Sequence, residues 1–304
     1  MLNMRIVNSN GAAMEIAAIN SNKINILNVW EPDRLNAETA RQNVGNVDVR
    51  HVYLGTEEML PMKRSAEADI IYVNIARKNY KATESSVPIV DKNVAGKSDG
   101  NGTLVMKNAF RMISMQEPEM FIIEYGLHSL HPVAMEAFTK IPRYYIQKIQ
   151  MTSVSDCGMP IKRNRSFIVG TKKDYHRKTF TKRTPPRLTD ILEKGLEYGE
   201  LPQYAKNRLN RVTKAYPAVV IDPCMDWLTP PFTAHYAKDD SAILLQDGPI
   251  IRPFTVKEIA RLNGYEDSFI FAGTPKEQIR QIGDSIGVGV ADWVVSDIIL
   301  DYFR

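Results

Sequence analysis

The part of the chain best suited to binding phosphate is a strongly basic segment in its middle. This segment runs from Ile161 to Arg187 and holds ten Lys or Arg residues against a single acid, Asp174. Tyr175, His176 and Phe180 are interleaved, which suits phosphate contacts combined with stacking on bases or sugars. A solvated basic linker explains the charge equally well. The candidate nucleic-acid contacts are Lys162, Arg163, Arg165, Lys172, Lys173, Arg177, Lys178, Lys182 and Arg183.

The cysteines and histidines predict neither a metal site nor a nucleophile. Cys157 and Cys224 are the two cysteines of the sequence, and they form no C-x-x-C pair. A single cysteine is more often a small buried hydrophobe than a nucleophile. His128 and His131 are spaced as H-x-x-H, but without a third ligand in view surface or packing roles are far commoner than zinc binding.

The elements that position these residues follow an α/β pattern. Short apolar runs rich in β-branched residues alternate with helical patterns, which favours a mostly parallel sheet with crossover helices. Thr83 to Gly102 is rich in turn formers and is expected to be a surface loop, whereas Asp190 to Arg211 looks helical but mostly polar. The expected strands are Ile24 to Trp30, Ala68 to Asn74, Met120 to Glu124, Tyr144 to Thr152 and Phe167 to Gly170. The other expected helices are Pro32 to Asn43, Gly102 to Met115, Thr255 to Leu262 behind an N-cap at Thr255, and Val288 to Phe303.

The composition is that of an ordinary folded chain. It has 304 residues, 44% of them hydrophobic and 24% charged, with a formal net charge of +4. The length allows one large domain, or a large and a small one, with a substantial core. No segment approaches the run of ~18 apolar residues that a membrane span needs. With two cysteines and no leader-like segment, we expect a protein of the reducing cytoplasm.

Four segments, in order along the chain, resemble motifs of the DNA cytosine-5 methyltransferases. Residues 252–269 read RPFTVKEIARLNGYEDSF and are similar to the family's R-P-L-T-x-R-E-x-A-R-L-Q-x-F-P-D-x-F. Residues 281–286, QIGDSI, resemble Q-I-G-N-x-V, and residues 158–170, GMPIKRNRSFIVG, resemble G-x-P-Q-x-R-x-R-x-F-I-V-G. Residues 118–126, PEMFIIEYG, resemble the P-x-x-F-x-x-E-N-V strand, while Glu31 resembles the acid of the second motif.

The resemblance implies a Rossmann-like, S-adenosylmethionine-dependent methyltransferase fold with a small, reduced target-recognition-type domain. The large domain is expected to comprise residues 1–171 and 275–304, and the small basic domain residues 172–274. Because the target-recognition region is short, any DNA recognition is expected to have low sequence specificity.

The same resemblance predicts a degenerate catalytic site. Family members deliver a cysteine thiolate from a G-G-P-P-C-Q turn to a flipped cytosine, and the aligned position here is Arg77. A guanidinium stays protonated and cannot form that adduct. Glu124, Arg163 and Arg165 match positions that, in active relatives, contact the target base or lie near it. Since Arg77 stands in place of the nucleophile, no catalytic residue is expected.

The cofactor motif is also reduced. Where the family has D-L-F-x-G-x-G-G, residues 5–12 read RIVNSNGA, which leaves Gly11 in place. Glu31, which in relatives would take the ribose hydroxyls, is retained. We therefore expect Gly11 and Glu31 to be remnants of a cofactor site, with no cofactor bound, or S-adenosylmethionine if the site still functions.

Two functional hypotheses follow. The first is an inactive methyltransferase homologue that serves as a binding module, with DNA, an active methyltransferase or another protein as its partner. The alternative is a diverged active S-adenosylmethionine-dependent DNA cytosine methyltransferase, or another base-modifying enzyme, built on Arg77, Glu124 and Arg163. A pocket filled by side chains such as Tyr72 or Met14 would argue against the enzyme.

Overall fold

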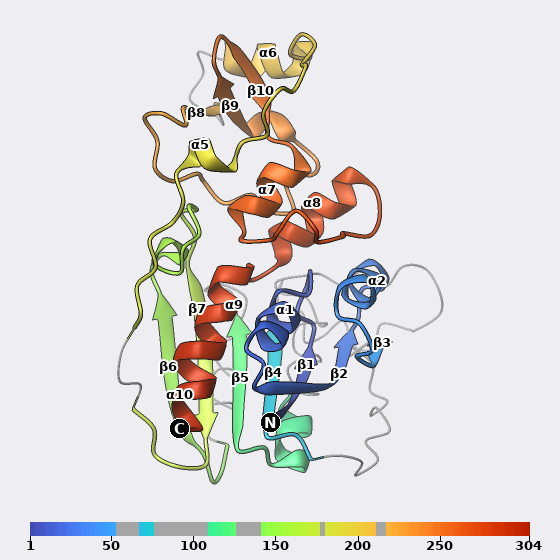
Figure 1. Ribbon diagram of the computed structural model, residues 1–304, viewed down its shortest axis with the longest axis vertical. Helices are drawn as coiled ribbons and strands as arrows, with labels where there is room; N and C mark the ends of the chain where they lie inside the picture. Colours follow the sequence, from blue (N-terminus) through green and yellow to red (C-terminus); the bar gives the residue numbers. More distant parts are fainter. Residues whose placement is uncertain (53–66, 76–108, 126–140, 177–179, 211–216) are drawn as a thin grey trace, which may run out of the picture.

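The computed structural model describes residues 1–52, 67–75, 109–125, 141–176, 180–210 and 217–304. Within these residues the strands form a seven-stranded sheet in the order β3-β2-β1-β4-β5-β7-β6 and a three-stranded sheet in the order β10-β9-β8 (Figure 1). Strands β1 to β5 run parallel, and β7 lies antiparallel between β5 and β6. The predicted mostly parallel sheet is thus confirmed.

The large sheet contains every strand expected from the sequence, with ends shifted by up to two residues. The sheet also contains β1 and β3, which the sequence did not predict. Asn3 and Arg5 interrupt the apolar pattern of β1, and Arg50 interrupts that of β3. The strands are β1 (Leu2–Val7), β2 (Ile24–Glu31), β3 (Val49–His51), β4 (Ile70–Ile75), β5 (Met120–Tyr125), β6 (Tyr145–Met151) and β7 (Arg165–Thr171), followed in the small sheet by β8 (Val219–Ile221), β9 (Ile243–Asp247) and β10 (Ile250–Pro253).

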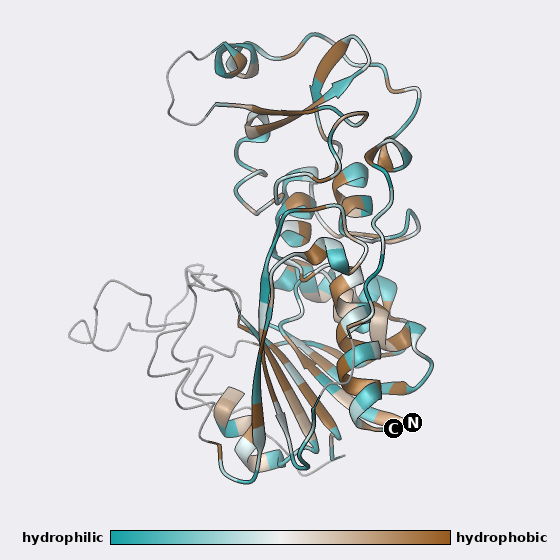
Figure 2. Ribbon diagram, turned by 90° about the vertical axis from the view of Figure 1, so that its left-hand side faces the viewer, coloured by the Kyte–Doolittle hydropathy of each residue, from teal (hydrophilic) through white to brown (hydrophobic). Residues whose placement is uncertain are grey.

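Helices cover both faces of the large sheet (Figures 1 and 2). One apolar cluster joins Met4, Ile6, Ile70 and Phe167 to helices on the face that carries α1. The second joins the opposite side chains of the same strands to residues 109–116, which are helical. The labelled helices are α1 (Ala13–Asn20), α2 (Arg34–Asn43), α5 (Leu188–Ile191), α6 (Gln203–Leu209), α7 (Val256–Leu262), α8 (Pro275–Asp284), α9 (Val288–Trp293) and α10 (Leu300–Tyr302). Because β4 is buried along its whole length, it needs apolar partners on both faces.

Two helix predictions need correction. Asp190 to Arg211 is not one helix, because glycines at 195 and 199 and Pro202 interrupt it and leave the short α5 and α6. Val288 to Phe303 is helical as expected, but its middle, Val294–Ile299, winds as a π-helix between α9 and α10.

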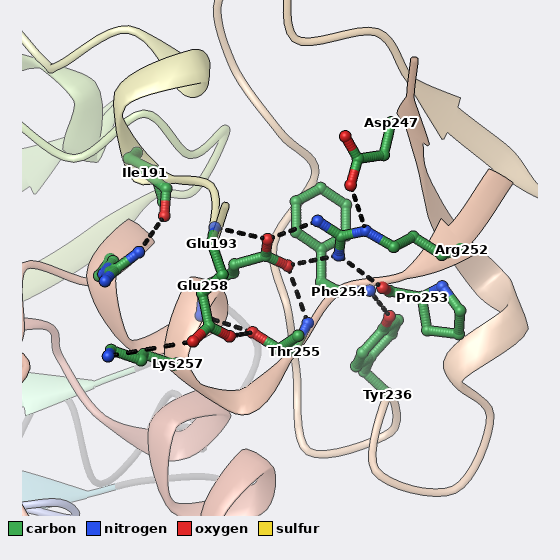
Figure 3. A network of polar contacts seen from close by, with 11 residues as sticks. Ile191, Glu193, Tyr236, Asp247, Arg252, Pro253, Phe254, Thr255, Lys257 and Glu258 are labelled. Atoms are coloured by element: carbon green, nitrogen blue, oxygen red, sulfur yellow. Dashed lines mark hydrogen bonds and ion pairs between the residues drawn. The ribbon is translucent and has the colours of Figure 1, made fainter. Parts of the chain in front are cut away.

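The N-cap predicted at Thr255 is confirmed as a full capping box. The Thr255 hydroxyl accepts a hydrogen bond from the Glu258 backbone N–H, and the Glu258 carboxylate accepts one from the Thr255 backbone N–H. Glu258 also binds Arg252, which holds the start of α7 to the small sheet (Figure 3). Arg252 is 1% exposed, and its Nε donates to Asp247 at 2.7 Å.

No described helix is both long enough and apolar enough to cross a membrane.

Candidate functional site

The turn from β1 into α1 has an unusual backbone. Asn8, Asn10, Gly11 and Ala12 all have positive φ, between 54° and 78°. Asparagine and glycine tolerate this left-handed conformation, but alanine does so at a cost of about 1–2 kcal/mol. The loop therefore has backbone angles typical of glycine, although most glycines of the resembled motif are replaced by other residues.

Polar side chains fill the carboxyl edge of the sheet around this loop. The Asn8 amide donates to the Asn74 carbonyl at 2.7 Å, and so crosses from the end of β1 to β4. Glu31 is 1% exposed and accepts from the Asn10 backbone N–H at 3.1 Å. The Asn36 amide donates to the Asn10 side chain at 3.0 Å. The retained acid Glu31 thus binds the protein's own loop.

Gly11, the other expected cofactor residue, lies under a tyrosine. The Tyr265 hydroxyl donates to the Gly11 carbonyl at 2.8 Å and shares a 2.6 Å hydrogen bond with the Ser285 hydroxyl. A Cβ at position 11 would lie 3.0 Å from the Tyr265 oxygen, so both this close approach and the positive φ favour glycine there.

Glu124 lies at the end of β5 with both carboxylate oxygens engaged. Tyr72, one strand away on β4, donates its hydroxyl to Oε2 at 2.6 Å, and Arg165 Nη1 lies 3.2 Å from Oε1. Glu124 is 2% exposed and Tyr72 is fully buried. Burial, followed by the negative charge of Glu124, holds the pKa of Tyr72 well above its ordinary value, so the phenol stays protonated and donates.

Arg163 and Arg165 point toward the C-terminal part of the chain. Arg163 Nη2 donates to the Gly283 carbonyl at 2.8 Å, and Arg165 Nη2 donates to the Ser285 carbonyl. Burial, followed by the charge of Arg165, lowers the pKa of Arg163. The structure therefore places Arg163 and Arg165 in one region with Glu124, and each arginine is hydrogen-bonded to the backbone of residues 283–285.

The other cations of the basic segment differ in exposure. Lys162, Lys173 and Lys182 are exposed, Lys172 is half-buried, and Lys182 pairs with Asp156 at 2.9 Å. Arg183 is half-buried and lies 3.5 Å from Asp292. In this segment, exposed lysines thus lie next to Arg163 and Arg165, whose side chains point into the protein. The predictions for Arg77, Arg177, Lys178, His128 and His131 fall outside the described residues.

Comparison with known proteins places the chain in a family. The model of the C-5 cytosine-specific DNA methylase family matches residues 91–300. The chain belongs to this family. The Type II methyltransferase M.SsoII of Shigella sonnei is 28% identical over 223 residues, covering 67% of this chain, and M.DsaV of Dactylococcopsis salina is 29% identical over 160 residues, covering 48%. The chain spans 59% and 45% of the lengths of these relatives.

Solved structures agree on the fold. The S. pombe Dnmt2 methyltransferase has a TM-score of 0.78 at 17% identity, with both chains covered fully. A putative DNA modification methyltransferase encoded within an E. coli prophage has a TM-score of 0.75 at 17% identity, again over the full length of both chains. The Rossmann-like methyltransferase fold expected from the sequence is confirmed.

Several residues of the site escaped the sequence analysis of this cytosine methylase homologue. Asn8, Asn36 and Ser285 are small polar residues whose partners lie far away in sequence, so no local pattern marks them. Tyr265 could have been noticed, because it adds a hydroxyl where the family motif has phenylalanine. A phenol on an otherwise buried apolar position needs a hydrogen-bond partner.

The buried carboxyl of Glu15, on α1, predicts a pH-dependent stability. Burial raises its pKa from 4.5 to about 7, although the Ser9 hydroxyl donates to it at 2.7 Å. The native state therefore binds more protons than the unfolded state between these values, so stability falls as pH rises from 4.5 to 7. The expected loss is about 3 kcal/mol.

Glu15→Gln should remove this part of the pH dependence. Urea unfolding at a series of pH values measures it, with the exposed Glu38→Gln as the control that keeps the wild-type slope. Parallel curves for wild type and Glu15→Gln would contradict the assignment.

Proposed function

We propose that this chain is a cytosine-5 methyltransferase homologue that no longer transfers methyl groups and instead binds DNA. The observation that carries the proposal is the state of Glu124, a buried carboxylate that accepts a hydrogen bond from Tyr72 on one oxygen and pairs with Arg165 on the other. A catalytic acid at this position needs a free oxygen facing the base, within hydrogen-bond reach. Tyr72 and Met14 are also fully buried, which supports a pocket filled by the protein's own side chains.

Two contacts argue against S-adenosylmethionine, which the family uses. Ligands of doubly wound sheets bind where the strand order reverses, here between β1 and β4. The Asn8 amide crosses that position to Asn74, and Glu31 already accepts the Asn10 N–H. The residues present therefore do not fit the cofactor. The expected substitution of the nucleophile by Arg77 is a separate argument against methyl transfer.

DNA remains the partner best supported by charge. Lys162, Lys173 and Lys182 are exposed in the basic segment, and exposed lysines bind phosphate without reading sequence. We propose residues 1–171 and 275–304 as the scaffold domain and residues 172–274 as the small domain. We place the protein in the cytoplasm, as its cysteine content suggests. An active methyltransferase or another protein is the second class of partner, and it would bind without the salt dependence described next.

Salt dependence of DNA affinity tests the proposal. We expect log K for duplex DNA to fall linearly with log salt, and the triple variant Lys162→Ala, Lys173→Ala, Lys182→Ala to reduce the slope by about 2–3. The matched control changes three exposed lysines elsewhere, Lys23, Lys238 and Lys276, to alanine. Absent or salt-insensitive binding would overturn the proposal that the chain binds DNA. Equal slopes for the two triple variants would overturn the basic segment as its binding site.

One observation favours the alternative of a diverged enzyme. Ala12 is held at φ 55° in the loop of residues 8–12, and backbone strain is often retained at working sites. Calorimetric titration with S-adenosylmethionine, followed by methyl-transfer assays on cytosine-containing DNA, distinguishes the two. Micromolar binding and a methylated product would establish the enzyme and refute the inactive homologue.

A further inference from the structure

A tryptophan of the small domain is exposed to solvent and makes no contact that the described residues account for. Trp227 is 86% exposed and Met225, two residues earlier, is 76% exposed. The other tryptophans, Trp30 and Trp293, are 6% and 1% exposed. Aromatic side chains bury large apolar areas when they find a partner, so an exposed tryptophan beside an exposed methionine is a candidate contact surface.

The turn that carries Trp227 is built to keep its shape. The Asp222 carboxylate accepts from the Cys224 N–H at 2.9 Å, and the Asp226 carboxylate accepts from the Asp222 N–H at 2.8 Å. The Asp222 carbonyl also accepts from the N–H groups of Met225 and Asp226. Trp227 therefore follows directly on a hydrogen-bonded turn, which lowers the entropy lost when a partner binds.

The turn lies next to the basic segment. Two residues after Trp227, the Thr229 N–H donates to the Pro160 carbonyl at 2.9 Å, and the Lys162 N–H donates to the Thr229 carbonyl at 2.8 Å. Two residues span about 7 Å, so Trp227 lies within reach of the same ligand as the exposed Lys162.

We propose that Trp227 stacks on an unpaired base of a DNA strand whose phosphate is bound by Lys162. The inference rests on the proposed DNA binding and names the form of DNA that the site prefers. An indole ring stacks on any base, whereas the bases of an intact duplex have no free face. Asp222 and Asp226 repel phosphates from the turn itself, so the backbone of the strand lies on the Lys162 side and its base on the Trp227 side.

Affinities for two probes test the inference, a single-stranded oligothymidylate and a fully paired duplex of the same length. Trp227→Ala is expected to weaken single-strand binding roughly 5- to 150-fold and to leave duplex binding within about twofold. Trp227→Phe should retain most of the single-strand affinity because a ring remains. Met225→Ala, on the same turn, is the matched control and should have a smaller effect. Single strands should also quench the fluorescence of the wild type, and this quenching should be lost in Trp227→Phe.

The outcomes separate the two proposals. If neither probe binds even at low salt, the proposed DNA binding fails, and the inference fails with it. If both probes bind with normal salt dependence and Trp227→Ala binds single strands like the wild type, only the inference is overturned. A change in sedimentation of Trp227→Ala with unchanged DNA affinity would make the turn a protein contact and would also overturn it.

Discussion

Arg252→Ala is expected to lower the free energy of unfolding by about 3–5 kcal/mol. The guanidinium makes a two-point contact with Glu258, at 2.8 and 2.7 Å, and both side chains are almost fully buried. Removing Arg252 leaves the Glu258 carboxylate buried without its countercharge, which is more costly than losing the hydrogen bonds alone. Urea unfolding followed by circular dichroism measures the change.

Removing both charges should cost less than removing one. Arg252→Met with Glu258→Gln keeps an acceptor for the Thr255 N–H and leaves no buried charge, so it is expected to be more stable than Arg252→Met alone. The exposed pair of Arg50 and Asp48 supplies the control, because Arg50→Ala should cost less than about 1 kcal/mol. A double variant less stable than Arg252→Met would refute the buried-charge explanation.

Gly170→Ala is expected to destabilise the large sheet by about 3 kcal/mol or more. Gly170 on β7 faces Phe121 on β5 in register, and a Cβ there would lie 2.1 and 2.2 Å from two ring carbons of Phe121. The ring is packed edge-on against Tyr144, with ring centres 5.0 Å apart, and cannot move away freely. Equilibrium unfolding in urea is the measurement.

A double-mutant cycle with Phe121 shows whether Gly170→Ala destabilises the protein through this clash or because β7 accepts no side chain at position 170. In a Phe121→Ala background, which by itself should cost about 3–5 kcal/mol, adding Gly170→Ala should cost less than about 1 kcal/mol. Gly199→Ala, where a Cβ meets no atom within 4 Å, should change stability by no more than about 0.5 kcal/mol. Additive costs for Gly170→Ala and Phe121→Ala would contradict the clash.

The fold was predictable from the sequence where local signals agree with tertiary packing. β4 and β5 each begin with four consecutive apolar residues, and α7 carries its own capping box, so their positions followed from residue types. β1 was not predictable from its pattern, because buried Arg5 interrupts the apolar run and is accommodated by Asn28 and the Trp30 ring. β8 is three residues long and carries too little pattern to recognise.

The sequence named candidate site residues but not their hydrogen-bond partners. Family resemblance proposed Glu31, Glu124 and the arginine pair, and the structure places these residues near the carboxyl edge of one sheet. The direction of Arg163 and Arg165 was not predictable, because their acceptors lie 120 residues away. Single hydrogen bonds at such a separation leave no trace in a local sequence pattern.

The contacts that bind the two ends of the chain together bear on how the protein is made. The Thr39 hydroxyl donates to Gln281 at 2.6 Å, Tyr265 reaches back to Gly11, and Asn43 bonds to Ile270. At about 5–20 residues per second, a ribosome needs roughly 12–50 s to pass from Thr39 to Gln281. Strands made early thus wait for helices made much later, and in this interval their apolar faces are open to chaperones or to other nascent chains. A chain that stops before Tyr265 and Gln281 is therefore expected to aggregate.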